Sequence, residues 1–272
     1  GSLLELDWKI DLIDVSDFCK DPSSPTLYNN TIVFFDGSLE NRPIYLYDIN
    51  TKAYKMIYSE LDPEMLINDT RIGEKWVFWT ESPNVSAEKW IIKGYNIETT
   101  EIVTVKEGES SINSTLVPRI VFDGDSLIWI EGTKLDEDIV THQIFEYNIE
   151  TKEINEITKL NTLQNPYTVL DFKNNTISYM DYKNDIWNLF LLNTEAQSVF
   201  EIPLTDKSIY ETPSKVASGN NYSAYITDFD ALYAYLHNTK ETMYVDRAGS
   251  GSLATGDNYI LYVRSGYLKL YK

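Results

Sequence analysis

A charged side chain recurs at one position of this sequence, directly after a short apolar segment with an aromatic residue at its centre. Five occurrences are carboxylates and the sixth is an arginine: Asp36, Glu81, Glu131, Asp181, Asp228 and Arg264. If these segments lie side by side, their ends form a ring. A ring of carboxylates could hold Ca²⁺ through oxygen ligands or attract a cationic partner. The simpler interpretation is that these acids face solvent, because the formal net charge is −19.

Carboxylates in pairs could also cleave glycosides, since two acids at a suitable separation are sufficient for that chemistry. The chain has many acids, but no local motif selects one pair. A carboxylate-dependent glycoside-processing enzyme is therefore the alternative hypothesis and not the first one. No cofactor is expected, apart from the Ca²⁺ that the ring of acids could bind.

Two tryptophans, Trp90 and Trp187, precede the third apolar segment of their repeats, where we expect loop edges. Exposed aromatic side chains there could stack on a sugar or anchor a protein partner. Packing in the core is the competing interpretation.

Other catalytic chemistry has little support in the sequence. The two histidines, His142 and His237, are expected at the surface, and two are too few for a histidine-rich metal centre. The single cysteine, Cys19, excludes an internal disulfide and a cysteine-based zinc site. The sequence contains no Gly-x-Ser-x-Gly elbow, Walker loop or Rossmann fingerprint.

The elements that position these side chains come from an internal repeat. Each copy has a Gly or Asn turn, an apolar segment around an aromatic residue, a second alternating segment, and in most copies a turn with threonine. The central aromatic residues are Phe34, Phe78, Trp129, Tyr179, Tyr225 and Tyr262. Period-2 alternation and aromatic content predict strands, and a repeat of about 45 residues is typical of propeller blades. We therefore predict an all-β fold, a six-bladed β-propeller of four-stranded antiparallel blades.

The two ends of the chain are expected to close the ring. The sixth repeat ends at Lys272 after its third strand, while residues 8–13 resemble a strand without a repeat of their own. Pairing this N-terminal strand with the last blade removes exposed sheet edges. Gly1-Ser2 is typical of a cloning remnant, and residues 3–272 are predicted to form a single domain.

Loops on a rigid scaffold usually carry the binding function. An antiparallel meander places alternate connections on opposite faces, and one of the two sets is short here. The other set is expected to be long and irregular, with connections at residues 36–43, 59–65, 81–89, 106–115, 131–142 and 181–188. Binding is predicted on this long-loop face.

The run Asn-Asn-Thr-Ile-Ser-Tyr-Met-Asp-Tyr-Lys-Asn-Asp-Ile-Trp-Asn-Leu-Phe at residues 174–190 resembles the repeat of TolB-like propellers. That repeat has an apolar-aromatic strand, a short Asp/Asn/Gly loop and a strand of the form Ile-Tyr-x-x-Asp/Asn. All six repeats are similar to it in outline, although Gly-Asp or Asn-Asn replaces the Pro-Asp-Gly turn of the family. The resemblance implies the fold, and it allows interaction modules, sensor ectodomains and the non-catalytic propellers of peptidases.

Composition limits the partners. Against 23 Lys and Arg there are 42 Asp and Glu, so nucleic-acid phosphates and anionic lipids are repelled. No apolar run is long enough for a membrane helix, so no membrane insertion is expected. We predict a monomeric, non-enzymatic recognition module, the sensor or ligand-binding ectodomain of an exported bacterial protein, that binds a protein, peptide or glycan outside the cytoplasm. A third hypothesis is a structural domain that supports a preceding part of its own chain.

Overall fold

The computed structural model describes residues 13–60, 62–83, 89–109, 117–136, 139–161, 170–184, 186–204, 212–248, 253–255, 260–264 and 267–271. These residues fall into two compact units. The N-terminal unit lies within residues 10–140 and 145–155, and the C-terminal unit within residues 141–144 and 156–272. Each regular element in the described ranges is a strand.

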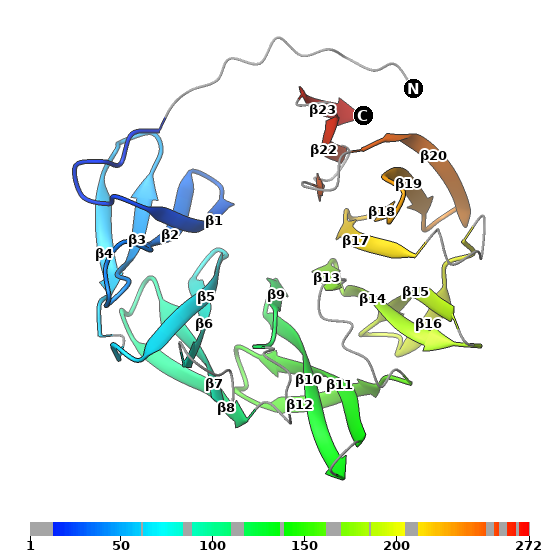
Figure 1. Ribbon diagram of the computed structural model, residues 1–272, viewed down its shortest axis with the longest axis horizontal. Coiled ribbons are helices and arrows are strands. Elements are labelled where there is room, and N and C mark those ends of the chain that lie inside the picture. The colour runs from blue at the N-terminus through cyan, green and yellow to red at the C-terminus, as the bar shows by residue number, and fades with distance from the viewer. Residues whose placement is uncertain are drawn as a thin grey trace. The chain divides into compact units, whose positions relative to one another are not determined.

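The N-terminal unit contains two complete four-stranded antiparallel meanders (Figure 1). The first sheet consists of β1 (Pro22–Tyr28), β2 (Thr31–Asp36), β3 (Ile44–Asp48) and β4 (Tyr54–Tyr58). The second consists of β5 (Met65–Ile72), β6 (Trp76–Pro83), β7 (Lys89–Asn96) and β8 (Ile102–Glu109). The first strands of these sheets, β1 and β5, pack beside each other.

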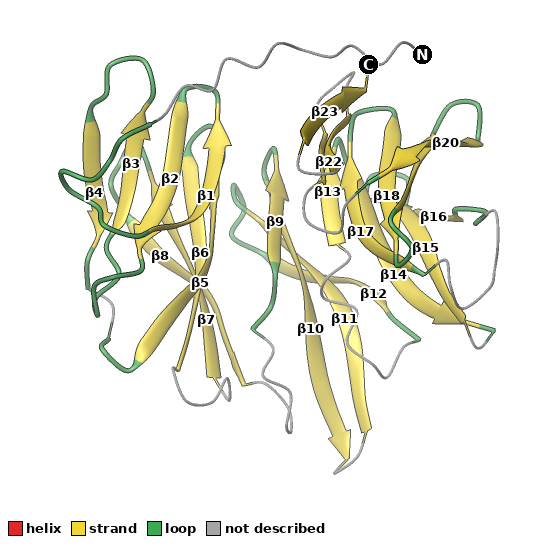
Figure 2. Ribbon diagram, turned by 45° about the horizontal axis from the view of Figure 1, so that its top comes forward, coloured by secondary structure: helices red, strands yellow, loops and turns green. Residues whose placement is uncertain are grey.

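A third four-stranded meander spans the boundary between the two units. It consists of β9 (Ile120–Asp123), β10 (Ser126–Asp136), β11 (Ile139–Asn148) and β12 (Ile154–Lys159). Its central strands, β10 and β11, are 11 and 10 residues long and form a long ribbon (Figure 2).

The C-terminal unit contains two further four-stranded meanders and one three-stranded sheet. The four-stranded sheets are β13 (Leu170–Lys173), β14 (Thr176–Lys183), β15 (Ile186–Asn193) and β16 (Ser198–Glu201), followed by β17 (Pro213–Ser218), β18 (Tyr222–Thr227), β19 (Ala231–Leu236) and β20 (Glu241–Arg247). The last sheet has β21 (Leu253–Thr255), β22 (Ile260–Arg264) and β23 (Tyr267–Tyr271).

The expected turns form for a local physical reason. Asn174 and Asn175 both have positive φ, 49° and 57°, which suits the tight two-residue link between β13 and β14. In the first three sheets, a side-chain oxygen also stabilises the turn between the third and fourth strands. The side chain of Asp48, Asn96 or Asn148 accepts hydrogen bonds there from the backbone amides two and three residues further along the chain. Such side-chain acceptors stabilise tight turns, so the threonine-containing connectors are confirmed as hairpin turns.

The core follows the repeated aromatic position. All six central aromatic side chains are at most 4% exposed. In the N-terminal unit, Phe78 of β6 packs with Ile120, Leu127 and Trp129 of the following sheet. In the C-terminal unit, Tyr225 of β18 packs with Met180 of the preceding sheet. The prediction that these residues pack in the core between neighbouring sheets is confirmed for these two positions.

For two of the connections, the prediction of a long loop is wrong. Residues 181–188 form a tight hairpin, because cross-strand pairing continues to Lys183 opposite Ile186. Residues 131–136 belong to β10 and residues 139–142 to β11 instead of a loop, since polar strand residues such as Thr141 obscure the alternation that marks a strand. The connection at residues 36–43 is a loop between β2 and β3, as expected.

The sixth four-stranded blade is not confirmed, because the last repeat shows three strands in the described ranges. Apart from Ile13, the strand expected to complete it lies outside the described residues. Closure of the ring and the single-domain organisation of residues 3–272 stay predictions.

Candidate functional site

Glu81, at the end of the central strand β6, lies inside a polar network. Its side chain is 3% exposed, and one carboxylate oxygen lies 3.0 Å from Nζ of Lys93 on β7. Trp79 Nε1 donates to the other oxygen at 2.9 Å. Lys93 also donates to the hydroxyl of Tyr58, from the outermost strand of the first sheet, at 3.0 Å. Burial raises the pKa of Tyr58, and its hydrogen bond with Glu81 raises it further. The charge of Glu81 is therefore matched within the fold.

Glu131 repeats this arrangement in the next sheet with a lysine from a different strand. Trp129 Nε1 donates to Glu131 at 3.1 Å. Lys106 of β8 donates to both carboxylate oxygens, at 3.0 and 2.8 Å. The same ammonium lies 4.4 Å from the centre of the Phe145 ring, within the range of a cation–π interaction. This ion pair joins the second sheet to the third.

The sequence pattern behind both sites is Trp-x-Glu within a central strand, β6 or β10. Residues two apart on a strand share a face, so each indole N–H meets the carboxylate that follows it. The repeat Trp79-Thr80-Glu81 and Trp129-Ile130-Glu131 is visible in the sequence and could have predicted this contact. The ion pairs of Lys93 and Lys106 with these glutamates could not be predicted from the sequence, because they depend on how the strands pair and pack.

Asp36 and Asp181 are held by backbone amides. Asp36 is 1% exposed and accepts hydrogen bonds from Ser38 and from the amides of Lys20 and Asp21. Burial alone would raise the pKa of Asp36, but these hydrogen bonds outweigh it and the pKa lies below its usual value. Asp181 is 4% exposed and accepts from the backbone and side-chain amides of Asn161. Both carboxylates anchor the chain next to a strand end.

The remaining two ring positions differ from these four. Asp228 is exposed in the turn after β18, whereas the buried carboxylate of that sheet is Asp246, which accepts from the Tyr262 hydroxyl at 2.8 Å. Arg264 is the last residue of β22 and pairs with Tyr267 across the sheet. In the described parts of the chain, no three His, Cys, Asp or Glu side chains gather closely enough to hold a metal ion. The Ca²⁺ hypothesis stays a prediction.

Both tryptophans were expected to precede their strands, but each is the second residue of its strand. Trp90 is within β7 and 2% exposed, packed in the core that joins the second and third sheets. Gly108 of β8 lies directly over it, and a Cβ at that position would come within 2.1 Å of the indole. Trp187 is within β15, half-buried, with its ring centre 5.5 Å from that of Tyr182.

The expected surface position is also wrong for His142, which is 4% exposed because it lies within β11. His237 is half-buried, and its Nε2 lies 2.9 Å from the hydroxyl of Ser223. Ser223 is fully buried, and its hydroxyl forms a hydrogen bond with that of Ser178, which in turn forms one with the hydroxyl of Ser218. Burial lowers the pKa of His237.

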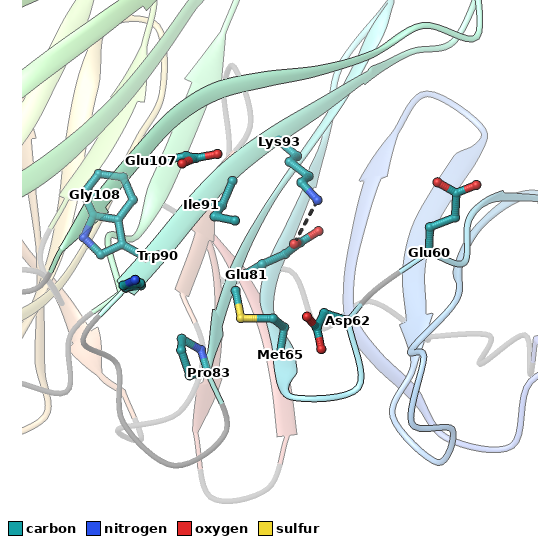
Figure 3. A pocket seen from close by; sticks show the side chains of 11 residues that line it. Glu60, Asp62, Met65, Glu81, Pro83, Trp90, Ile91, Lys93, Glu107 and Gly108 are labelled. Carbon is teal, nitrogen blue, oxygen red and sulfur yellow. Dashed lines mark ion pairs between the residues drawn. The ribbon is translucent and has the colours of Figure 1, made fainter.

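A cavity of about 510 Å³ opens beside the Glu81–Lys93 ion pair (Figure 3). Four carboxylates and two ammonium groups line it together with apolar side chains: Glu60, Asp62, Met65, Glu81, Pro83, Lys89, Trp90, Ile91, Lys93, Glu107 and Gly108. Every lining residue belongs to the N-terminal unit. Figure 3 shows Glu60 and Glu107 on opposite sides of the ion pair. The cavity includes part of the expected connection at residues 59–65 and the ends of β6 and β8.

No protein-family model and no curated protein matches this sequence. Similar solved structures include an oligogalacturonate lyase in complex with manganese, with a TM-score of 0.64 and 10% identity, over 89% of this chain and 73% of that chain. TolB from Acinetobacter baumannii has a TM-score of 0.54 and 14% identity, over 84% of this chain and 55% of that one. A chain of a nidogen/laminin complex has a TM-score of 0.52 and 15% identity, over 79% of this chain and 74% of that one.

At these identities the comparisons show the fold alone, and that fold is a β-propeller. This chain spans about half the length of the TolB chain. Among the described residues, no helix has the length and apolar character needed to cross a membrane.

Proposed function

We propose that this chain is a non-enzymatic recognition module that binds a protein or peptide through the cavity beside the Glu81–Lys93 ion pair, called here the cavity of the second sheet. The observation that carries this proposal is the cavity itself, because its volume lies in the range of roughly 300–1,000 Å³ that is usual for ligand sites. Its lining combines charged and apolar side chains, which is the composition of a recognition surface.

The state of the strand-end acids supports a binding function over an enzymatic one. A general acid or base must reach the reacting atoms of a substrate. Glu81 and Asp36 are buried and already accept several hydrogen bonds, and Glu131 is held by Lys106. These contacts suit a structural role for the acids. In the same proposal, the module is TolB-like and lies outside the cytoplasm, and glycan is a second class of ligand.

The proposal is tested by selecting peptides from a random displayed library on the immobilised wild-type protein. Selected peptides are then measured against Asp62→Lys/Glu107→Lys, which changes the cavity. Glu150→Lys/Glu153→Lys is the matched control, since both residues are exposed in the turn between β11 and β12 and the charge change is the same. We expect at least a tenfold loss of affinity in the cavity variant and less than a twofold change in the control.

Three outcomes contradict the proposal: no peptide is enriched, both variants lose affinity equally, or the cavity variant binds as tightly as the wild type. A parallel incubation with neutral oligosaccharides tests the glycoside-processing alternative. Turnover that disappears in Glu131→Ala or Asp181→Ala, while the thermal melt shows a folded protein, would support that enzyme instead.

A further inference from the structure

We infer that the cavity of the second sheet takes a lysine or arginine side chain of the partner. This inference rests on the proposed function, because it names the chemistry of the group that the same site receives. Its basis is the arrangement of charge and apolar surface in the cavity, together with the way in which this fold holds its own lysines.

The charge of the lining is unbalanced. Lys93 already pairs with Glu81 at 3.0 Å, so that pair contributes no net charge. The other charged lining residues are Glu60, Asp62 and Glu107 against Lys89, and all four are exposed. A cationic group that enters therefore meets an excess of carboxylates, whereas an anionic sugar or phosphate is repelled.

The apolar part of the lining fits the stem of such a side chain. Met65, Pro83 and Ile91 are partly exposed in the same cavity. Lysine and arginine place their methylene groups along apolar surface while the charged head stays among polar groups. A small inorganic cation would leave this apolar surface unused, so the lining favours an amphipathic side chain over a bare ion.

The protein itself shows how this surface holds an ammonium group. Lys93 lies 5.3 Å from the centre of the Tyr58 ring as well as next to Glu81. Lys106 is held in the same manner between Glu131 and the Phe145 ring. Carboxylate and aromatic ring together therefore bind lysine twice in neighbouring sheets, and the cavity borders the first of these two sites.

The test uses a pentapeptide with one lysine between glycines, blocked at both ends, and the same peptide with acetyl-lysine. The acetylated peptide keeps the stem and loses the charge. Backbone amide shifts of ¹⁵N-labelled protein are followed to about 10 mM peptide, because a single side chain is expected to bind in the millimolar range. We expect saturable shifts at Ile91 and Gly108 with the lysine peptide and none with the acetylated peptide.

Neutral variants then test the carboxylates. Asp62→Asn/Glu107→Gln is expected to weaken the binding of the lysine peptide about threefold to tenfold, which is about 0.7–1.4 kcal/mol and lies within the range that two exposed ion pairs contribute. Glu150→Gln/Glu153→Gln is expected to change it less than twofold. Equal shifts from the acetylated peptide, shifts spread over the acidic surface, no shift at all, or equal affinity in the cavity variant would each overturn the inference. Library peptides that bind the cavity without lysine or arginine would leave the proposed function standing and remove only this inference.

Discussion

Replacing Lys93 with methionine removes the ammonium group that faces Glu81 while keeping most of the length and apolar volume of the side chain. The Glu81 side chain is 3% exposed and that of Lys93 is 21% exposed, so the variant leaves a carboxylate inside the fold without its counter-charge. Breaking a buried ion pair from one side costs about 3–5 kcal/mol. Because Trp79 still donates to Glu81 and Lys93 is partly exposed, we expect the lower end, about 3 kcal/mol.

The matched control is Lys75→Met, since Lys75 and Glu98 form a pair at 3.9 Å with side chains 56% and 64% exposed. Such a pair contributes about 0–1 kcal/mol. The free energies of unfolding are measured by urea denaturation, with thermal melts in parallel. The Lys93 variant is expected to melt about 6–12 °C lower, given about 2–4 °C per kcal/mol for a large domain.

A double variant separates the ion pair from other effects of the substitution. Lys93→Met/Glu81→Gln removes both charges and keeps an oxygen that can accept from Trp79, so it is expected to lose less stability than the Lys93 variant alone. The reasoning is refuted if Lys93→Met and Lys75→Met lose stability within 1 kcal/mol of each other.

Four further perturbations test other parts of the fold. Because burial lowers the folded-state pKa of His237, its contribution to stability is present above the unfolded value near 6.5 and is lost as the pH falls through the folded value; His237→Gln is expected to flatten the urea-denaturation stability profile between about pH 7 and 5, and an unchanged slope would contradict this. At Gly94 a Cβ would lie 2.6 Å from the ring of Phe78, so Gly94→Ala is expected to cost about 1–3 kcal/mol by overpacking, in contrast to a neutral effect of the surface change Glu98→Ala. Deleting residues 3–15 is expected to lower the melting temperature sharply if the N-terminal strand closes the ring; Val15→Ala controls for the loss of that one buried side chain, and an unchanged melt argues against closure. A melt in EDTA followed by 1 mM Ca²⁺ tests the acids: a Ca²⁺ site with a Kd near 10 μM would add about 2.7 kcal/mol to the free energy of unfolding, and an unchanged melt would contradict the Ca²⁺ hypothesis.

The fold could be predicted from the sequence wherever one side-chain position repeats. Phe78 and Trp129 stand at the same place in successive repeats, and both are fully buried as strand centres. The period-2 signal fails where a strand is polar, which is why residues 131–142 resembled a loop. It also led to a surface position for His142, although that residue lies within β11.

The candidate site could be predicted only in part. The position of Glu81 at the end of a strand follows from the repeat, but its partners do not, because Tyr58 and Lys93 reach it from strands whose packing the sequence does not state. The cavity was missed for the same reason. It depends on Gly108, which lets β8 pass over the indole of Trp90, and on the placement of Asp62 before β5.

The most direct test of the recognition function is the affinity of one library-selected peptide for three proteins. These are the wild type, Asp62→Lys/Glu107→Lys and Glu150→Lys/Glu153→Lys, all verified as folded by their melts. Binding through the cavity predicts at least a tenfold loss in the first variant and less than a twofold change in the second. Equal affinities for all three proteins would contradict binding through this cavity.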